Sequence, residues 1–575
     1  MRRLLNPKLL LIQVSLLVAL ACAQGGQPDR SSTGPVLEAA PATPTAAAAP
    51  LPTPAPEPAA LPMAPSVPNL RRGGALTISS PASFPSRDVH QESQAALASL
   101  GPGLAYSRLL RIHSGPADSP SAPILECDLC ESWRMTADFV YEFKLRSGVH
   151  WQKVAPVNGR PLVAQDLVFS YNRQRTPGWP NASILAPIRK VAAPDTRTLQ
   201  VRLAYADSDG LLALADGHSK VIAPEVVALH GDLQASPVAG TGPWMWDASS
   251  TADHTILTRN PDYFLPSQPL LDRLEFRSFS TELGTQWPGD RLLAAFRAGQ
   301  VDVFTPDLET WRQIRQARQS VNTVVSAQGG HGLTLSINVQ SPNLQSAAVR
   351  HAVFKAIDPW DYLDALWLGQ GQAGVGLPVL DSAAALGKDY LRSRYFADPA
   401  AARQLLASAG MPLPAKVDVV VGDFGPSYVA AGNKLADDLA AVGFKPTMRR
   451  LNAAQFQEQV FGNQRDYQIA LGVTPPADST NAYLATLLHS QGRWNVAGHQ
   501  DKKLDNLIQR QAAELDPALR QQQLRELQQY VVEQGYLFNL VNGGTRWVYA
   551  DGLRAFYPVT ANSEYGFWSQ VWREK

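Results

Sequence analysis

Apolar and polar residues alternate along three short stretches of the chain, at residues 141–145, 199–203 and 333–337. This period of two is typical of half-buried strands. Elsewhere the apolar positions recur every three or four residues, which predicts helices. One such helix covers residues 349–357 and should end at Asp358, because the proline that follows disfavours helical backbone in the residue before it. Strands and helices mixed along the chain predict an α/β fold.

Two further helices are marked at both of their ends. Asp398 and Asp516 each precede a proline. The aspartate side chain can cap the first turn of a helix, and the φ of the proline already suits that turn. Gly410 and Gly535 follow the two apolar patterns at the position where a left-handed residue commonly ends a helix. The sequence therefore predicts helices between these pairs of residues.

The length of the chain calls for more than one core. It has 575 residues, of which 45% are hydrophobic and 18% charged, so a wholly disordered or fibrous protein is excluded. The 51 basic and 50 acidic side chains leave a formal net charge of +1. Because so small a net charge gives no long-range attraction for a polyanion, we expect no nucleic-acid partner.

The first residues have the layout of a secretory signal. Arg2, Arg3 and Lys8 precede an apolar run at residues 9–21, and these 13 residues are too short to remain as a membrane span. Cys22 follows small residues, as in a bacterial lipoprotein signal, so we expect its lipidation and assign residues 1–22 to the signal. Secretion with cleavage but without lipid is the alternative. The only membrane contact expected is this lipid anchor.

A segment rich in proline and alanine follows the signal. Residues 31–70 contain 11 prolines and 11 alanines among 40 residues, and residues 23–70 contain no aromatic side chain. Such a composition cannot bury enough apolar surface to offset the entropy lost on ordering. We expect residues 23–72 to be a disordered tether that holds a folded body away from a membrane.

Spaced blocks of sequence between about Gly73 and Tyr557 carry a family pattern. The blocks cover residues 129–133, 141–149, 161–173, 240–243, 259–263, 299–302, 349–358 and 401–410. In this order they resemble the extracellular solute-binding proteins of the peptide and nickel class, which serve ABC importers. Several blocks in the right order are more specific than any single motif.

The resemblance implies a two-lobed, type II periplasmic-binding-protein-like fold that closes on its ligand. Two chain crossings near residues 329–330 and 543–544 would form the hinge, where glycines absorb dihedral changes at little steric cost. The expected parts are lobe I at residues 73–332 plus 542–575, a subdomain inserted into lobe I at about 105–230, and lobe II at 333–541.

Peptide-binding relatives pair the ligand's ammonium group with an aspartate from lobe II. The matching loop covers residues 472–479, and the position of that aspartate is held by Pro476. Asp478 lies two residues further on and could take the role if the loop is offset, as a charge-assisted bond in a closed cleft. The alternative is that Asp478 caps the helix that begins near Thr480. Val473 and Thr474 of the same loop are also candidates for ligand contact.

The strand that enters lobe II lines the cleft in relatives. Its apolar residues point to the core, which leaves His331, Thr334 and Ser336, and the period of two places the last two on one face. Neutral hydrogen-bonding groups suit an amide or polyol ligand better than an ion. Plain packing or surface placement remains the alternative for the further cleft candidates, which are Ser83, Phe84, Trp494 and Asn495.

Cys127 and Cys130 are separated by two residues, in the order CxxC. In an oxidising compartment a local disulfide is the simplest outcome, and two small buried thiols are the alternative. A zinc site would need a second pair of ligands, and the sequence has no HExxH, nucleophile elbow or phosphate-binding loop. We therefore expect no metal, no cofactor and no catalytic residues.

The sequence thus predicts a binding protein and not an enzyme. The expected function is capture of an extracytoplasmic solute, a peptide or similar amide-rich ligand, and its delivery to ABC permease subunits. We expect a monomer tethered to the cell membrane by Cys22, in the periplasm or at the cell surface. An oligosaccharide receptor, or a sensor or hydrolase-like protein that is not coupled to transport, is the alternative.

Overall fold

The structure is a computed structural model. It describes residues 71–80, 83–84, 86–92, 95–115, 124–278, 289–317, 320–374, 384–462, 465–473, 479–558 and 566–574. The predicted signal with Cys22 and nearly all of the predicted tether lie outside the described residues.

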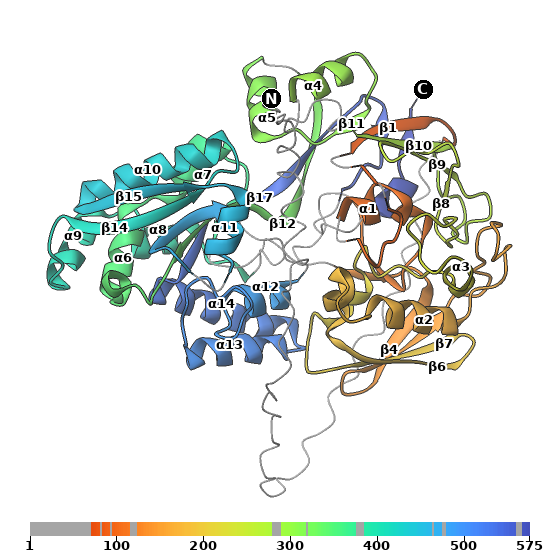
Figure 1. Ribbon diagram of the computed structural model, residues 1–575, viewed down its shortest axis with the longest axis horizontal. Coiled ribbons are helices and arrows are strands. Elements are labelled where there is room, and N and C mark those ends of the chain that lie inside the picture. Colours follow the sequence, from red (N-terminus) through yellow and green to blue (C-terminus); the bar gives the residue numbers. More distant parts are fainter. Residues whose placement is uncertain are drawn as a thin grey trace, which may run out of the picture.

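One 11-stranded sheet runs through the molecule (Figure 1). Its order is β15-β14-β16-β12-β17-β11-β1-β10-β9-β8, and β13 pairs with β17. The strands are β1 (Ala75–Ser80), β8 (Trp244–Trp246), β9 (His254–Arg259), β10 (Arg273–Ser278), β11 (Val303–Phe304), β12 (Asn322–Ile337), β13 (Gln372–Gly374), β14 (Ala415–Gly422), β15 (Phe444–Leu451), β16 (Ile469–Val473) and β17 (Leu537–Tyr549). The predicted strand at residues 333–337 is confirmed as the last part of β12.

Smaller sheets lie beside the β8 to β11 half of this sheet. A four-stranded sheet has the order β4-β5-β7-β6, and its strands β5 and β7 confirm the two other predicted strands. The remaining strands are β2 (Leu110–Ile112), β3 (Leu125–Cys127), β4 (Cys130–Ala137), β5 (Val140–Leu145), β6 (Ile188–Asp195), β7 (Thr198–Leu203), β18 (Leu553–Arg554) and β19 (Trp572–Arg573).

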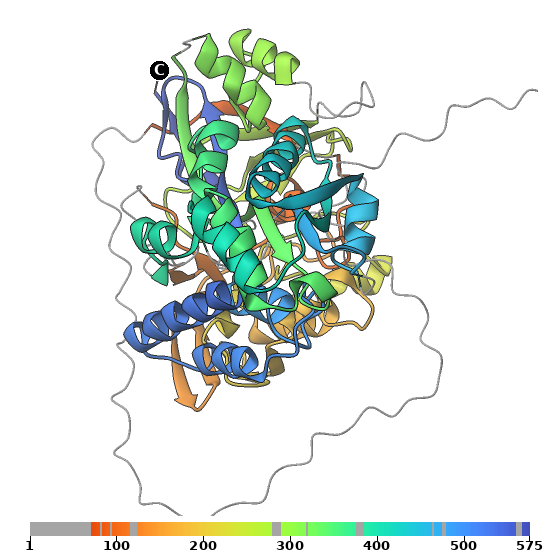
Figure 2. The same cartoon turned by 90° about the vertical axis from the view of Figure 1, so that its left-hand side faces the viewer.

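Helices cover both halves of the molecule, and Figure 2 shows those of the β14 to β16 half in front of their strands. In chain order the helices are α1 (Ala95–Ser99), α2 (Ala164–Gln174), α3 (Pro224–His230), α4 (Gly289–Arg297), α5 (Leu308–Gln316), α6 (Ala347–Ala356), α7 (Pro359–Trp367), α8 (Lys388–Tyr395), α9 (Pro399–Ser408), α10 (Pro426–Val442), α11 (Ala453–Gln459), α12 (Thr480–Leu487), α13 (Lys502–Ala512) and α14 (Pro517–Gln534).

The predicted helix ends are confirmed by their capping contacts. Asp398 accepts a hydrogen bond from the amide of Ala401 at the start of α9, and Asp516 accepts from two amides at the start of α14. Gly535 ends α14 in the left-handed conformation. The helix predicted at residues 349–357 is α6, and the next helix begins directly after Asp358. These local signals succeeded because caps depend on neighbours in the sequence.

Two large hydrophobic cores divide the molecule. One is built from residues between Leu76 and Phe276, with Val303 and the tail from Trp547 to Val571. The other is built entirely from residues between Leu333 and Val541. We use lobe I and lobe II for the parts that surround these two cores. The boundaries given above stay a prediction, and the distribution of core residues supports them.

Only β12 and β17 of the main sheet pass from one core to the other. They pair antiparallel over nearly their whole length, with an irregularity between Ser326 and His331. A Cβ atom on Gly332 would lie 2.0 Å from the carbonyl oxygen of Val541, and one on Gly544 would lie 2.3 Å from that of Ser326. Glycine is therefore required here because the two backbones approach so closely.

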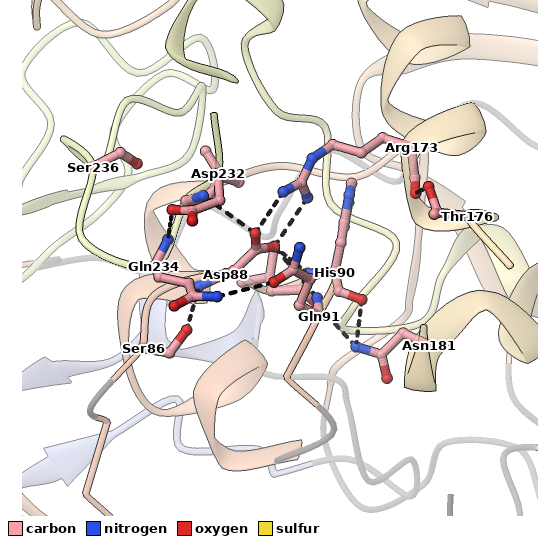
Figure 3. A network of polar contacts seen from close by, with 12 residues as sticks. Ser86, Asp88, His90, Gln91, Arg173, Thr176, Asn181, Asp232, Gln234 and Ser236 are labelled. Atoms are coloured by element: carbon pink, nitrogen blue, oxygen red, sulfur yellow. Dashed lines mark hydrogen bonds and ion pairs between the residues drawn. The ribbon is translucent and has the colours of Figure 1, made fainter. Parts of the chain in front are cut away.

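A buried ion pair ties the loop after β1 to the inserted four-stranded region (Figure 3). Arg173 of α2 donates from Nη1 to Oδ1 of Asp88 at 3.0 Å and from Nη2 to Oδ2 at 2.5 Å. The side chain of Asp88 is 0% exposed and that of Arg173 is 7% exposed. Burial alone would raise the pKa of Asp88, but the bidentate bond to the guanidinium holds it below the ordinary value.

Neighbouring polar groups complete this network. The Asn181 amide donates to the backbone carbonyls of Val89, His90 and Glu92. His90 is buried, and its Nε2 contacts the carbonyl oxygen of Lys220 at 3.0 Å. Burial and the adjacent Arg173 charge lower the pKa of His90 to about 4. We define the buried network as Asp88, Arg173, His90 and Asn181.

Cys127 and Cys130 form a disulfide, so the simplest of the predicted outcomes is confirmed. The bridge lies between β3 and β4, close to the lobe I core. Within the part of the chain that the structure describes, none of the helices combines the length and apolar character needed to cross a bilayer.

Candidate ligand-binding site

Three of the predicted contact residues line one cavity in lobe II. Thr334 and Ser336 of β12 face it together with Val473 of β16, and the Tyr483 side chain of α12 forms part of the same wall. The cavity is small, with a volume of about 10 Å³, which is about the space that one water molecule needs. Its other lining residues are Phe456, Val460, Phe461, Ala470, Leu487, Val496 and Leu537.

Strand register explains why these residues meet. Leu333 pairs with Val473, and Thr334 pairs with Gly472, so the start of the lobe II part of β12 lies beside the end of β16. A Cβ atom on Gly472 would lie 2.2 Å from the ring of Phe456, which shows how closely α11 covers this strand end. The period of two in β12 therefore places Thr334 and Ser336 on the same face, toward this cavity.

A neutral hydrogen-bond network forms the polar side of the cavity. Thr334 Oγ1 lies 3.3 Å from Oδ1 of Asn539, whose Nδ2 donates to the Tyr483 hydroxyl at 3.3 Å. Asn539 is fully buried, and burial raises the pKa of Tyr483, so its hydroxyl stays protonated at ordinary pH. The cavity thus combines apolar walls with uncharged donors and acceptors.

Helix α12 is capped by a different residue from Asp478, the cap considered above. Ser479, and not Asp478, is the N-cap residue of α12, because its side chain accepts from the amide of Ala482 at 3.0 Å. The interpretation of Asp478 as the cap is therefore wrong, since the adjacent hydroxyl occupies that position. Asp478 and Thr474 lie outside the described residues, so their predicted contact with a ligand is a proposal.

Trp494 and Asn495 lie at the edge of the lobe II core. The Trp494 ring packs on that of Phe461, a lining residue of the cavity, with centroids 5.2 Å apart. Asn495 is 1% exposed, and its Nδ2 donates to the carbonyls of Ser490 and His499 at 2.9 Å each. Both amide hydrogens of Asn495 are therefore used within the fold, so a ligand would reach them only if those bonds broke.

The predicted contacts of lobe I lie in the loop that follows β1. Ser83 donates to the carboxylate of Asp253, and Phe84 is buried, with its ring 3.0 Å from the position of a Cβ on Gly101. No described contact joins these two side chains to the lobe II cavity. His331 pairs through its backbone with Gly543 at the crossing strands.

Sequence reasoning missed Tyr483, which lines the cavity, and Asn539, the buried residue that hydrogen-bonds to Tyr483 and Thr334 behind it. Tyr483 is part of an apolar helix pattern, and Asn539 interrupts an apolar strand. A buried amide within an otherwise apolar strand was the available signal, because such a group needs a partner. The described residues contain no group of three or more His, Cys, Asp or Glu side chains that could hold a metal ion.

Two curated relatives are named as binding proteins. The chain is 24% identical over 366 residues to a probable di/tripeptide-binding protein 5 of Pseudomonas aeruginosa, an alignment that covers 59% of this chain and 66% of that protein. It is 24% identical over 461 residues to the probable ABC transporter periplasmic-binding protein SapA of Escherichia coli, which covers 75% and 80% of the two chains.

Solved structures share the fold. The periplasmic binding protein DppA of Helicobacter pylori, in complex with the peptide STSA, superposes with a TM-score of 0.66 at 20% identity and covers 88% of this chain and 99% of its own. The substrate-binding protein CtaP of Listeria monocytogenes gives a TM-score of 0.73 at 19% identity, with 88% and 100% covered. The predicted two-lobed α/β fold of periplasmic binding proteins is thereby confirmed.

A family model matches most of the folded chain. It describes the bacterial extracellular solute-binding proteins of family 5, and it matches residues 125–495, which contain the disulfide, Asn495 and most of the residues that line the lobe II cavity. The match covers more than half of the 575 residues. The chain therefore belongs to the bacterial extracellular solute-binding proteins of family 5.

Proposed function

We propose that this protein captures a peptide or a similar amide-rich solute between its lobes and delivers it to an ABC permease. Its family supplies the general role of solute binding. The name of its relative from E. coli supports the transport role, and that of its relative from P. aeruginosa supports a peptide ligand. Binding energy drives hinge closure, and no covalent step is involved.

The observation that carries this proposal is the pair of strands that links two separate cores. Because only β12 and β17 of the main sheet pass from the lobe I core to the lobe II core, the lobes can rotate as units while each core stays packed. The register shift between Ser326 and His331 lies at this crossing, where the chain contains the pair Gly329 and Gly330. Dihedral changes are least costly at such a place.

The ligand contacts that we propose come from both lobes. Lobe I contributes the loop after β1, and lobe II contributes the adjoining ends of β12 and β16 with the cavity beside them. Neutral hydroxyl and amide groups with apolar walls suit an uncharged backbone and apolar side chains better than an ion. The proposed residues are Ser83, Phe84, His331, Thr334, Ser336, Val473, Thr474, Asp478, Trp494 and Asn495.

The protein is proposed to act outside the cytoplasmic membrane as a monomer held by lipidated Cys22. The Cys127–Cys130 disulfide supports an oxidising compartment. The Pro/Ala-rich residues 23–72 would give the receptor reach between the lipid anchor and the permease. No residue is proposed to be catalytic.

A thermal-shift screen with peptides, oligosaccharides and metal chelates tests the proposed function. We expect short peptides to raise the melting temperature, because a ligand that binds only the folded protein stabilises it. If oligosaccharides alone raise it, the ligand class is wrong. If no solute raises it and a chromogenic ester or peptide is hydrolysed, the receptor function is wrong.

Asp478→Ala tests the ammonium contact within that function. If Asp478 pairs with the peptide's amino terminus, this change should weaken the binding of a free-amine peptide at least about tenfold, which is about 1.4 kcal/mol. The same peptide with an acetylated terminus should then bind both proteins equally. Ser479→Ala is the matched control, because it removes the cap of α12 and should lower stability without that preference. Equal affinity of Asp478→Ala and the unchanged protein would remove Asp478 from the site.

A further inference from the structure

A second contact region joins the two lobes far along the chain from the crossing strands. The loop that follows β7 in lobe I lies against the ends of three helices of lobe II. Its residues are Asp207, Ser208 and Asp209, and they contact Asn481 of α12, Ala512 of α13 and Arg520 of α14. We call these six residues the interlobe latch. Figure 1 shows α12, α13 and α14 beside the region that contains β7.

Asp209 makes the charged contact of the latch. Its Oδ1 lies 2.6 Å from Nη1 of Arg520, and the side chains of the two residues are 9% and 18% exposed. Its Oδ2 accepts from the backbone amide of Asn481 at 2.9 Å. A carboxylate from lobe I therefore binds both a guanidinium and a helix amide of lobe II, which are two charge-favoured partners.

The amide of Asn481 has no partner within its own helix. It belongs to the second residue of α12, and amides of the first turn lack a carbonyl four residues earlier. Ser479 satisfies the next amide, that of Ala482, so the two lobes share the capping of one helix. Separation of the lobes would leave the Asn481 amide to solvent.

The Asn481 side chain binds to both lobes. Its Nδ2 donates to Oδ1 of Asp207 at 2.5 Å, and its Oδ1 accepts from Arg520 at 3.1 Å and from Gln511 at 2.9 Å. One more bond needs no side chain, because the amide of Ser208 donates to the carbonyl of Ala512 at 2.8 Å. Asn481 is only 7% exposed. The contact is thus a closed hydrogen-bond network and not a single surface ion pair.

We propose that the interlobe latch holds the two lobes together before any solute binds. The bonds made by Asp207, Ser208 and Asp209 join the inserted region of lobe I to helix ends of lobe II, so these bonds break when the lobes separate, whereas those from Asn481 to Arg520 and Gln511 stay within lobe II. A hinge protein samples open and closed states, and contacts made only in the closed state raise its population. The latch therefore reduces the closure energy that a ligand must supply, and Asp207, Asp209, Asn481 and Arg520 are positioning residues for the closed state.

Hydrogen exchange of single amides in the ligand-free protein tests this proposal. In the unchanged protein we expect slow exchange at the amides of Ser208 and Asn481, because their only acceptors lie in the opposite lobe. Asp209→Ala should accelerate exchange at the Ser208 amide at least about tenfold, within the usual range of coupling between sites. That amide keeps its own acceptor in this variant, so its exchange reports separation of the lobes.

Arg510→Ala is the matched control for a second variant, Arg520→Ala. Arg510 pairs with Glu526 across α13 and α14, beside the latch but wholly within lobe II. Arg520→Ala should accelerate exchange at Ser208 and Asn481, while Arg510→Ala should leave both unchanged. Exchange at buried amides of β5 in lobe I and of β14 in lobe II should stay slow in every variant, which would show that both lobes remain folded.

Small-angle X-ray scattering of the same ligand-free proteins measures the opening directly. We expect a larger radius of gyration for Asp209→Ala and Arg520→Ala than for the unchanged protein and for Arg510→Ala. If the radius and the Ser208 exchange are the same in all four proteins, the latch does not hold the lobes and the proposal is wrong. Because no solute is used, this result is independent of the proposed ligand.

Discussion

Two aspartate clusters of lobe I show how differently a carboxylate can be used. In the buried network Asp88 is fully enclosed and pairs with Arg173 of the same lobe. In the interlobe latch Asp207 and Asp209 bind residues of the other lobe, and the Asp209–Arg520 pair keeps partial contact with solvent. The first arrangement fixes one part of the fold to another, and the second joins two parts that are proposed to separate.

The pKa shifts of the two clusters have opposite signs. The bidentate guanidinium lowers the pKa of Asp88 despite its burial. Burial raises the pKa of Asp207, because its partner is the neutral amide of Asn481 and the Asp209 charge lies nearby. A fully paired carboxylate thus strengthens the fold when ionised, whereas Asp207 is ionised at a cost. The cost of ionising Asp207 weakens the latch, which suits a contact that has to open when the lobes separate.

The largest expected effect comes from removal of the Asp88 charge. Asp88→Asn leaves the Arg173 guanidinium buried without a counterion, so we expect a loss of about 3–5 kcal/mol in the free energy of unfolding. Urea unfolding followed by tryptophan fluorescence measures it. Lys190→Ala, at an exposed position of β6, should change the same quantity by less than about 0.5 kcal/mol. A loss below about 1 kcal/mol for Asp88→Asn would contradict the structural role of the network.

The buried network should also make stability depend on pH through His90. Burial lowers the folded-state pKa of His90 to about 4, while the unfolded value is about 6.5. The unfolded chain therefore binds the proton more readily, and stability should fall as the pH drops from about 6.5 toward 4, by up to about 3 kcal/mol. The charged and titratable neighbours of His90 are Arg173, Asp88 and His218.

His90→Gln is the variant that isolates this dependence. A glutamine amide can still donate to the Lys220 carbonyl but carries no titrating group, so the decline of the melting temperature between pH 6.5 and 4 should become shallower. The exposed His150, changed in the same way, should leave the decline as steep as before. An equal slope in the unchanged protein and in His90→Gln would assign the pH dependence to other groups.

Replacement of aspartate by asparagine should have opposite effects at Asp88 and Asp207. It should weaken the buried network at Asp88 and strengthen the interlobe latch at Asp207. Asp207→Asn keeps an acceptor for Asn481 and removes the repulsion from Asp209, so we expect slower exchange of the Ser208 amide, by about twofold to fivefold. Its raised pKa predicts the same change on acidification, because the latched state gains stability as Asp207 becomes protonated. Faster exchange in Asp207→Asn would show that the ionised carboxylate is the stronger partner.

Salt should have the smallest of these effects, and it should weaken the interlobe latch but not the buried network. At about 1 M salt the screening length is about 3 Å, so the partly exposed Asp209–Arg520 pair should weaken and the Ser208 amide should exchange about twofold faster. The enclosed Asp88–Arg173 pair should show no comparable loss in the stability of lobe I. Equal sensitivity of the two would mean that the latch is as well shielded as the buried network.

The sequence predicted what depends on local pattern. Alternation located β5 and β7, and Asp398, Asp516 and Gly535 marked helix ends, because strands and caps follow from residues within a few positions. The family pattern placed Thr334 and Ser336 near one cavity for the same reason, since strand period and register are regular. The cap of α12 was misplaced by one residue, because aspartate and serine are equally good caps and the sequence alone does not separate them.

Contacts between distant residues could not be predicted in this way. Asp88 and Arg173 are 85 positions apart, and the latch joins Asp207 to Asn481 across 274 positions. Nothing near Asp209 in the sequence distinguishes it from a turn residue. Only the folded arrangement of the two lobes brings a loop carboxylate to a helix amide.

The chain returns to lobe I after it has formed lobe II, and this return sets the order in which the two cores can be completed during synthesis. All residues of the lobe II core lie between Leu333 and Val541, so this lobe can complete its core before the C-terminal residues are made. Lobe I cannot, because Trp547, Phe556 and Trp568 near the end of the chain belong to its core. Domains fold while the chain emerges during synthesis. Lobe I, most of which is made before lobe II, must therefore wait for the tail that follows lobe II before its core is complete. A stop codon placed between Val541 and Trp547 should therefore leave lobe II as the part that folds and lobe I as the part that proteases remove.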